Sequence, residues 1–118
     1  MAINYYREGY NCAESIIQSV NEKKKINIPV CIGSPFGSGM STGSVCGAAT
    51  AAVVAIGYLK GRNHSTEQNK AARYSKDLIK KIREKFGSEI CIDLKRKGVS
   101  CKEIIQFVDD YLKTLTQE

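Results

Sequence analysis

Hydrophobic residues recur with the period of an α-helix along most of the chain. Ala13, Ile16 and Ile17, for example, lie on one face of a helical segment, with polar residues between them. No segment alternates apolar and polar residues as a half-buried strand would. The pattern predicts helices over about 12–22, 45–59, 66–85 and 101–115, with short helical turns over 5–9 and 89–95.

The segment 45–59 differs from the others because it is apolar nearly all round and rich in alanine and glycine. A helix without a polar face belongs in the centre of a bundle. A glycine-rich loop over 33–44 precedes it, and 26–32 is expected to form an extended connector around Pro29. We therefore predict an all-α fold, a single-domain irregular bundle of four to five helices over residues 1–118.

Length and composition support a folded domain. The chain has 118 residues, 42% of them hydrophobic and 25% charged, which is near the average for globular proteins. Its first residues lack the apolar core of a secretory signal. The apolar segment 45–59 is shorter than the roughly 20 residues needed to span a bilayer. The expected location is the cytoplasm, with no membrane partner.

Basic residues are concentrated between Lys60 and Lys85 and contribute much of the net charge of +6. Such a stretch could meet an acidic partner or a nucleic acid. Its one aromatic residue is Tyr74 and it carries no nucleic-acid-binding motif, so we interpret it as a solvated helix face. No nucleic-acid partner is expected.

The five cysteines carry the candidate chemistry. In a reducing compartment, metal binding or redox chemistry is more common for cysteines than static disulfides. The chain contains no Cys-x-x-Cys pair, so neither a thioredoxin-type site nor a zinc ribbon is indicated. Any site that several cysteines share must therefore be assembled by the fold.

Four of the cysteines fall at predicted helix starts. Asn11 and Glu14 form a capping-box pattern around Cys12, and Ser100 and Glu103 form the same pattern around Cys101. Caps are also predicted at Ser44 for the helix containing Cys46, and at Ser88 for the turn containing Cys91. Amides and the dipole at a helix start favour thiolate, so lowered thiol pKa values are expected. Cys31 has no such cap and is interpreted as a small buried hydrophobe.

The glycine-rich loop lacks the preceding strand and the Lys-Ser/Thr of a phosphate-binding loop. We interpret its glycines as positions where backbone passes close to the Cys46 site, or to a cluster or small anion there. The candidate cofactor-binding residues are Gly37, Gly39, Gly43 and Gly47.

On these residues the chain resembles the redox-active family named for a GCAxxG-type motif and four cysteines, over about residues 5–112. The final glycine of the motif is Ala51 here, from which we expect slightly wider helix spacing. The resemblance implies redox activity through the four cysteines. Related cysteine sets in split-Soret cytochromes suggest an iron–sulfur centre as an option. The matching pieces are Gly9-Tyr10-Asn11-Cys12-Ala13-Glu14, the glycine loop, Cys46-Gly47-Ala48, Phe86-Gly87 with Cys91, and Cys101.

Three hypotheses remain open for Cys12, Cys46, Cys91 and Cys101. In the first, they exchange electrons by thiol–disulfide chemistry, as in a thiol-based oxidoreductase whose partner is a redox protein or a small thiol. In the second, they hold an iron–sulfur cluster in an electron-transfer module. In the third, they bind zinc or another thiophilic ion without turnover. A homodimer is one of the assemblies that the sequence leaves open.

Overall fold

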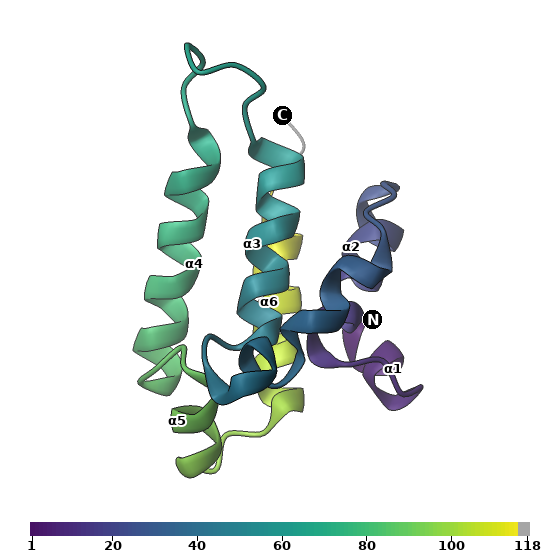
Figure 1. Ribbon diagram of the computed structural model, residues 1–118, viewed down its shortest axis with the longest axis vertical. Coiled ribbons are helices and arrows are strands. Elements are labelled where there is room, and N and C mark those ends of the chain that lie inside the picture. The colour runs from purple at the N-terminus through teal and green to yellow at the C-terminus, as the bar shows by residue number, and fades with distance from the viewer. Residues whose placement is uncertain (116–118) are drawn as a thin grey trace.

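The computed structural model describes residues 1–115, and within them the regular elements are helical (Figure 1). The all-α prediction is confirmed. Besides the helices, the described residues hold one isolated antiparallel β-bridge, between Val45 and Ile90. The elements are α1 (Ala2–Arg7), α2 (Cys12–Lys24), the 3-10 helix η1 (Val30–Phe36), the single π-turn η2 (Gly39–Gly43), α3 (Gly47–Lys60), α4 (Lys70–Phe86), α5 (Cys91–Arg96) and α6 (Cys101–Lys113).

Helix α3 lies at the centre of the bundle, packed against α2, α4 and α6. Figure 1 shows α3 and α4 side by side, joined by the loop at one end of the molecule, with α6 behind α3. Small side chains let the neighbours approach α3 closely, which is the role predicted for this segment. Its fully buried residues include Ala48, Ala49, Ala51, Ala52, Ala55 and Ile56.

The outer helices bury the stripes that their periodicity predicted. Leu78 and Ile82 of α4 and Ile105 and Val108 of α6 are fully buried. Helix α4 ends at Phe86 and is capped by Gly87, whose φ of 85° is the left-handed conformation that follows many helices. The hydrophobic period therefore located both helices and their inner faces.

A buried carboxylate ties α1, α2 and α6 together. Asp109 of α6 is 1% exposed and accepts hydrogen bonds from the Ala2 amide at 3.3 Å and the Ser19 hydroxyl at 2.7 Å. The Lys23 ammonium lies 2.9 Å from the same carboxylate. These partners lower the pKa of Asp109, although burial alone would raise it.

The segment before α3 is more ordered than predicted. The expected connector 26–32 and loop 33–44 instead contain η1 and η2. The backbone of Gly33 lies so close to α2 that an added Cβ would stand 2.9 Å from the Glu14 nitrogen. The Asn11 amide also donates hydrogen bonds to the carbonyl oxygens of Gly33 and Ser34. These long-range contacts with the start of α2 hold the segment in a helical turn.

Helix α4 begins four residues later than the predicted Thr66. Its cap is Asn69, whose side chain accepts a hydrogen bond from the Ala72 amide at 3.3 Å. Upstream, the Glu67 carboxylate accepts hydrogen bonds from the amides of Asn63 and His64. These bonds close a loop around Glu67 and exclude it from the helix.

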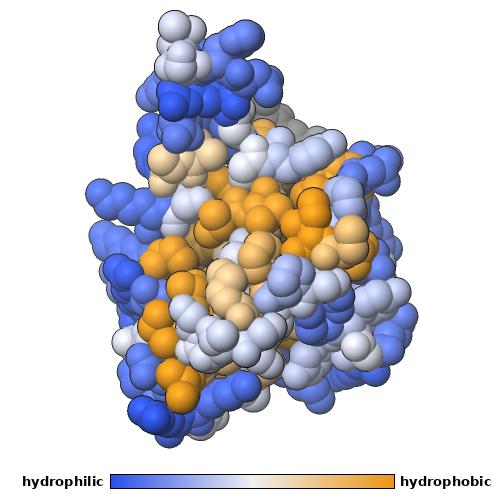
Figure 2. Space-filling view, viewed as in Figure 1, coloured by the Kyte–Doolittle hydropathy of each residue, from blue (hydrophilic) through white to orange (hydrophobic). Residues whose placement is uncertain are grey.

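The surface is mostly hydrophilic, but apolar side chains form a band across the face shown in Figure 2. Ile32, Val53 and Ile92 are among the exposed large hydrophobic residues, at 40%, 36% and 44% exposure. No helix between residues 1 and 115 has the length and apolar character required to cross a membrane. Self-association of the chain stays a prediction.

Candidate functional site

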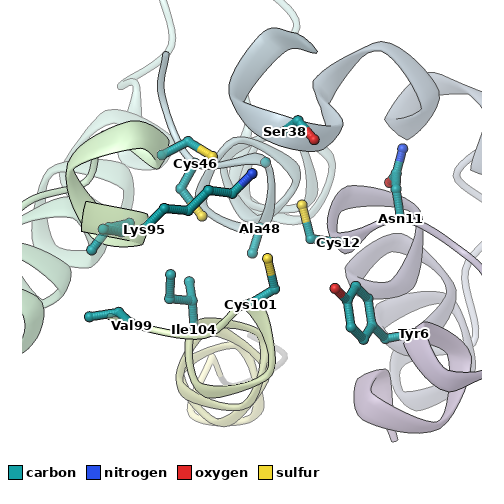
Figure 3. Close-up of a pocket in the computed structure, with 13 residues that line it drawn as sticks. Tyr6, Asn11, Cys12, Ser38, Cys46, Ala48, Lys95, Val99, Cys101 and Ile104 are labelled. Atoms are coloured by element: carbon teal, nitrogen blue, oxygen red, sulfur yellow. The ribbon is translucent and has the colours of Figure 1, made fainter. Parts of the chain in front are cut away.

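A cavity of about 190 Å³ lies where the starts of α2, α3, α5 and α6 meet (Figure 3). We call it the cysteine cavity because Cys12, Cys46, Cys91 and Cys101 all line it. These four cavity cysteines come from distant parts of the chain, and the fold brings them to one place. The lining is completed by Tyr6, Asn11, Ser38, Gly47, Ala48, Leu94, Lys95, Val99 and Ile104.

Two capping boxes position Cys12 and Cys101 as the first residues of their helices. The Asn11 side chain accepts a hydrogen bond from the Glu14 amide at 2.7 Å, and the Glu14 carboxylate accepts one from the Asn11 amide at 2.9 Å. Ser100 and Glu103 repeat the arrangement at the start of α6. Both predicted boxes are confirmed. Figure 3 shows the Cys101 sulfur pointing toward Cys12, and the Cys12 sulfur pointing toward Ser38.

The β-bridge positions Cys46 and Cys91. The Cys46 amide donates to the Glu89 carbonyl at 2.8 Å, and the Cys91 amide donates to the Ser44 carbonyl at 2.7 Å. These bonds pair the segment that precedes α3 with the segment that precedes α5. The pairing fixes the backbone of Cys46 and Cys91 beside the cavity.

The predicted serine caps at these two sites are wrong. Cys46 is itself the N-cap residue of α3, and Ile90 is the N-cap residue of α5. Ser44 contributes its carbonyl oxygen to the bridge, and the Ser88 hydroxyl accepts a hydrogen bond from the Ile90 amide at 3.0 Å. The long-range bridge replaces the local cap at both positions.

Two of the four candidate glycines make the close packing around the cysteines possible. A Cβ on Gly47 would stand 2.6 Å from the Cys12 sulfur and 2.6 Å from the Phe36 carbonyl oxygen. A Cβ on Gly39 would stand 2.6 Å from the Cys91 Cβ, and its φ of 63° is left-handed. Only a residue without a side chain fits at either position.

The other two candidate glycines do not line the cavity. An added Cβ on Gly37 would meet the Asn11 side chain at 2.7 Å, and one on Gly43 would meet Ile92 at 3.4 Å. Of the four glycines, Gly47 alone is part of the cavity lining. A cofactor-binding role for the set therefore stays a prediction.

Burial reverses the pKa shift expected for two of the thiols. Desolvation raises the pKa of Cys12, although the backbone N–H groups of Ser38 and Ala13 act to lower it. Desolvation likewise raises the pKa of Cys46 to about 11, against the opposing effect of the Ala49 and Ala48 amides. The prediction of lowered pKa values is wrong at both sites, because removal from water outweighs the helix-start amides.

Charges on neighbouring thiols add to these shifts and connect the cavity cysteines. The pKa of Cys12 is raised further by negative charge on Cys101 and, less strongly, on Cys91. Negative charge on Cys12 in turn raises the pKa of Cys46. Cys12 therefore interacts electrostatically with each of the other three cavity cysteines.

Two lining residues were not selected from the sequence. Tyr6 lies on the same side of the cavity as Cys101 (Figure 3), and burial, together with its interaction with Cys101, raises the pKa of Tyr6. Lys95 lies one helical turn after Cys91 on α5, and its side chain extends across the cavity (Figure 3). The four-residue spacing from Cys91 could have indicated Lys95. Nothing local distinguishes Tyr6 from Tyr5 or Tyr10.

The fifth cysteine lies outside the cavity. Cys31 belongs to η1 and is exposed, so its interpretation as a buried hydrophobe is wrong. Within η1, Gly33 is the buried residue, and Cys31 lies on the exposed side of this 3-10 helix. The exposed Cys31 offers a thiol of the same chemistry outside the cavity for comparison.

The donor atoms suit a thiophilic metal, but around the cavity they are not positioned to coordinate one ion together. Four thiolates are the usual ligands of iron–sulfur clusters and of many zinc sites. Within residues 1–115, however, no group of three or more His, Cys, Asp or Glu side chains is placed to hold a metal ion. The side chains as they stand do not fit such a group.

Comparison with known proteins gives one match. The model of the family described as "Putative redox-active protein (C_GCAxxG_C_C)" matches residues 10–115, which is most of the chain and includes all four cavity cysteines. No curated protein and no solved structure matches the chain.

Proposed function

The chain belongs to the C_GCAxxG_C_C family, and we propose that the four cavity cysteines cycle between dithiol and disulfide states to transfer electrons. The observation that carries this proposal is the convergence of four free thiols, from four separate helix starts, on one small cavity. A redox partner protein or a small thiol would supply and remove the electrons.

The burial of the cavity thiols supports a dithiol–disulfide cycle. Burial keeps Cys12 and Cys46 protonated at neutral pH, since it raises the pKa of both. A dithiol and a disulfide are both uncharged, so the two resting states of such a cycle avoid a buried charge. Only the brief exchange step requires a thiolate.

Thiol trapping in defined redox buffers tests the proposal. The protein is equilibrated with dithiothreitol mixtures of graded potential, alkylated, and analysed by mass spectrometry. We expect cavity cysteines to become protected in pairs at one reproducible potential. Cys31→Ser is the matched control and should leave that potential unchanged, while Cys12→Ser should remove at least one pair. Protection that requires Cys31, or oxidation that yields only intermolecular disulfides, would refute the proposal.

An iron–sulfur centre is the second candidate, because four thiols around one cavity match the ligand number of a cluster. Cluster binding would require the side chains to move closer together than they stand. The test is iron, sulfide and zinc analysis with a visible spectrum of protein purified without oxygen. Stoichiometric iron that is lost in Cys12→Ser and kept in Cys31→Ser would favour the cluster over thiol exchange. One bound zinc in colourless protein would favour a metal-binding role without turnover.

A further inference from the structure

Of the described residues that line the cysteine cavity, Lys95 is the only one with a formally charged side chain. Among residues 1–115, no carboxylate forms an ion pair with its ammonium group. The acidic groups on the neighbouring helix starts are already engaged. Asp93 accepts a hydrogen bond from the Ser88 hydroxyl at 3.2 Å, and Glu103 belongs to the capping box of α6. The cavity therefore presents one uncompensated positive charge.

The cavity thiols are not equally accessible. Cys12, Cys46 and Cys91 are only 9%, 6% and 9% exposed. Cys101 is half-buried, so it is the cavity thiol that a reagent from solvent meets first. Figure 3 shows the Tyr6 hydroxyl and the Cys12 sulfur on the same side of the cavity as Cys101. The accessible thiol of Cys101 therefore lies near a hydrogen-bond donor, the Tyr6 hydroxyl, and near a second thiol, that of Cys12.

We propose that the cavity accepts a small, negatively charged disulfide, which Lys95 holds while Cys101 attacks it. The inference rests on the proposed thiol–disulfide function and names its substrate class. The volume of about 190 Å³ is large enough for a short disulfide, since it far exceeds the roughly 10–15 Å³ needed to hold one water. A cation without a carboxylate partner, beside a largely apolar wall, attracts an anionic substrate and repels a cationic one.

The exchange proceeds in two balanced steps. The Cys101 thiolate attacks one sulfur of the substrate, its S–S bond breaks, and the departing thiolate takes a proton from water. In this proposal the Tyr6 hydroxyl, which lies on the same side of the cavity, donates a hydrogen bond to the Cys101 sulfur while that sulfur is negative. The Cys12 thiol then loses its proton to water and attacks the Cys101 sulfur, which releases the second substrate thiolate. Two protein thiols are oxidised, and one disulfide is reduced to two thiols.

Three disulfides of similar size and different charge test the substrate class. They are dithiodiglycolate, which is anionic, hydroxyethyl disulfide, which is neutral, and cystamine, which is cationic. Reduced protein carrying Cys31→Ser is mixed with each, and the oxidation rate is measured by quenched alkylation. Lys95→Gln should lower the ratio of the dithiodiglycolate rate to the cystamine rate about fivefold, the upper end of the range for an exposed charge pair. The hydroxyethyl disulfide rate should stay within about twofold.

Lys76→Gln is the matched control, because it removes the same charge from α4 at a position outside the cavity lining. It should leave the rate ratio unchanged. Tyr6→Phe should slow all three disulfides alike, since its hydroxyl acts on Cys101 and not on the substrate. An unchanged ratio in Lys95→Gln, or equal slowing of all three disulfides in that variant, would overturn the assignment of Lys95.

Mass spectrometry tests the order of the two thiols. In Cys12→Ser, a mixed disulfide should accumulate on Cys101, because the second step is blocked. In Cys101→Ser, the initial reaction should be at least tenfold slower. A first adduct on Cys12 or Cys46 would overturn the entry role of Cys101. If no disulfide reagent produces an intramolecular disulfide, the proposed function itself fails. If all three do so at rates independent of Lys95, only this inference fails.

Discussion

Replacing Gly47 by alanine tests the packing on which the cysteine cavity depends. The added methyl carbon would lie 2.6 Å from the Cys12 sulfur, 2.6 Å from the Phe36 carbonyl oxygen and 3.2 Å from the Phe36 carbonyl carbon. Ordinary contacts of this kind begin at about 3.5 Å. The Cys12 side chain could rotate away, but the Phe36 contact is with backbone, so η1 would have to shift relative to α3.

The expected cost follows from two opposing effects. Overpacking of a well-filled site costs about 1–3 kcal/mol. Alanine in a helix is favoured over glycine by up to about 1 kcal/mol, and less in the first turn, where Gly47 lies. The net loss in the free energy of unfolding should therefore be about 1–2 kcal/mol. Cys12 should also alkylate faster, because its sulfur is displaced from the amides and walls that now enclose it.

The same helix offers a matched control. Gly57 lies inside α3 and is exposed, and no atom of residues 1–115 comes within 4 Å of an added Cβ there. Gly57→Ala should therefore stabilise the protein by about 0.5–1 kcal/mol through helix propensity alone. Urea denaturation of the reduced proteins, followed by circular dichroism, measures both changes. A Gly47→Ala protein that is as stable as wild type, or that gains stability as Gly57→Ala does, would refute the packing argument.

Three further predictions concern stability. The raised pKa of Cys46 means that the unfolded thiol ionises first, so the free energy of unfolding should fall by about 2–3 kcal/mol between pH 9 and 11. Denaturant titrations should show this component in wild type and not in Cys46→Ala, and parallel pH curves would contradict it. Asn11→Ala and Ser100→Ala should each cost about 1 kcal/mol through loss of a capping box, and thermal unfolding that is unchanged in both would count against the caps. Asp109→Asn should cost about 2 kcal/mol at pH 7, because it removes the partner of Lys23. Because the pKa of Asp109 is lowered in the folded protein, this contribution is present above about pH 4 and is lost as the pH falls further. The unfolding free energies of the wild type and the variant should therefore converge in acid. A constant difference down to pH 2 would exclude the ionised pair as the source of the stabilisation.

Local patterns predicted the features that depend on residues close in sequence. The capping boxes at Asn11 and Ser100 join residues three positions apart, so the starts of α2 and α6 could be read correctly. The apolar segment before Leu59 indicated a buried helix because it had no polar face to expose. The positions of Cys12 and Cys101 followed from these same local signals.

The failures lie where distant segments meet. The bridge between Val45 and Ile90 replaced the predicted caps at Ser44 and Ser88, and the contact between Gly33 and α2 converted an expected connector into η1. Neither contact leaves a local trace, since each joins segments more than ten residues apart.

The pKa values of Cys12 and Cys46 are raised where the sequence predicted them to be lowered, and this failure also arises from packing between distant segments. From the sequence we could place Cys12 and Cys46 near helix starts, where the amides favour thiolate. The sequence does not show how completely the fold removes those thiols from water. Desolvation affects the pKa of both thiols more strongly than the helix-start amides do. The amino-acid sequence thus specified the helices, their inner faces and the capping boxes beside Cys12 and Cys101, all of which follow from spacing of a few residues. The assembly of the cavity, the charge of Lys95 within it and the protonation of its thiols depend on packing between distant segments, and packing alone established them.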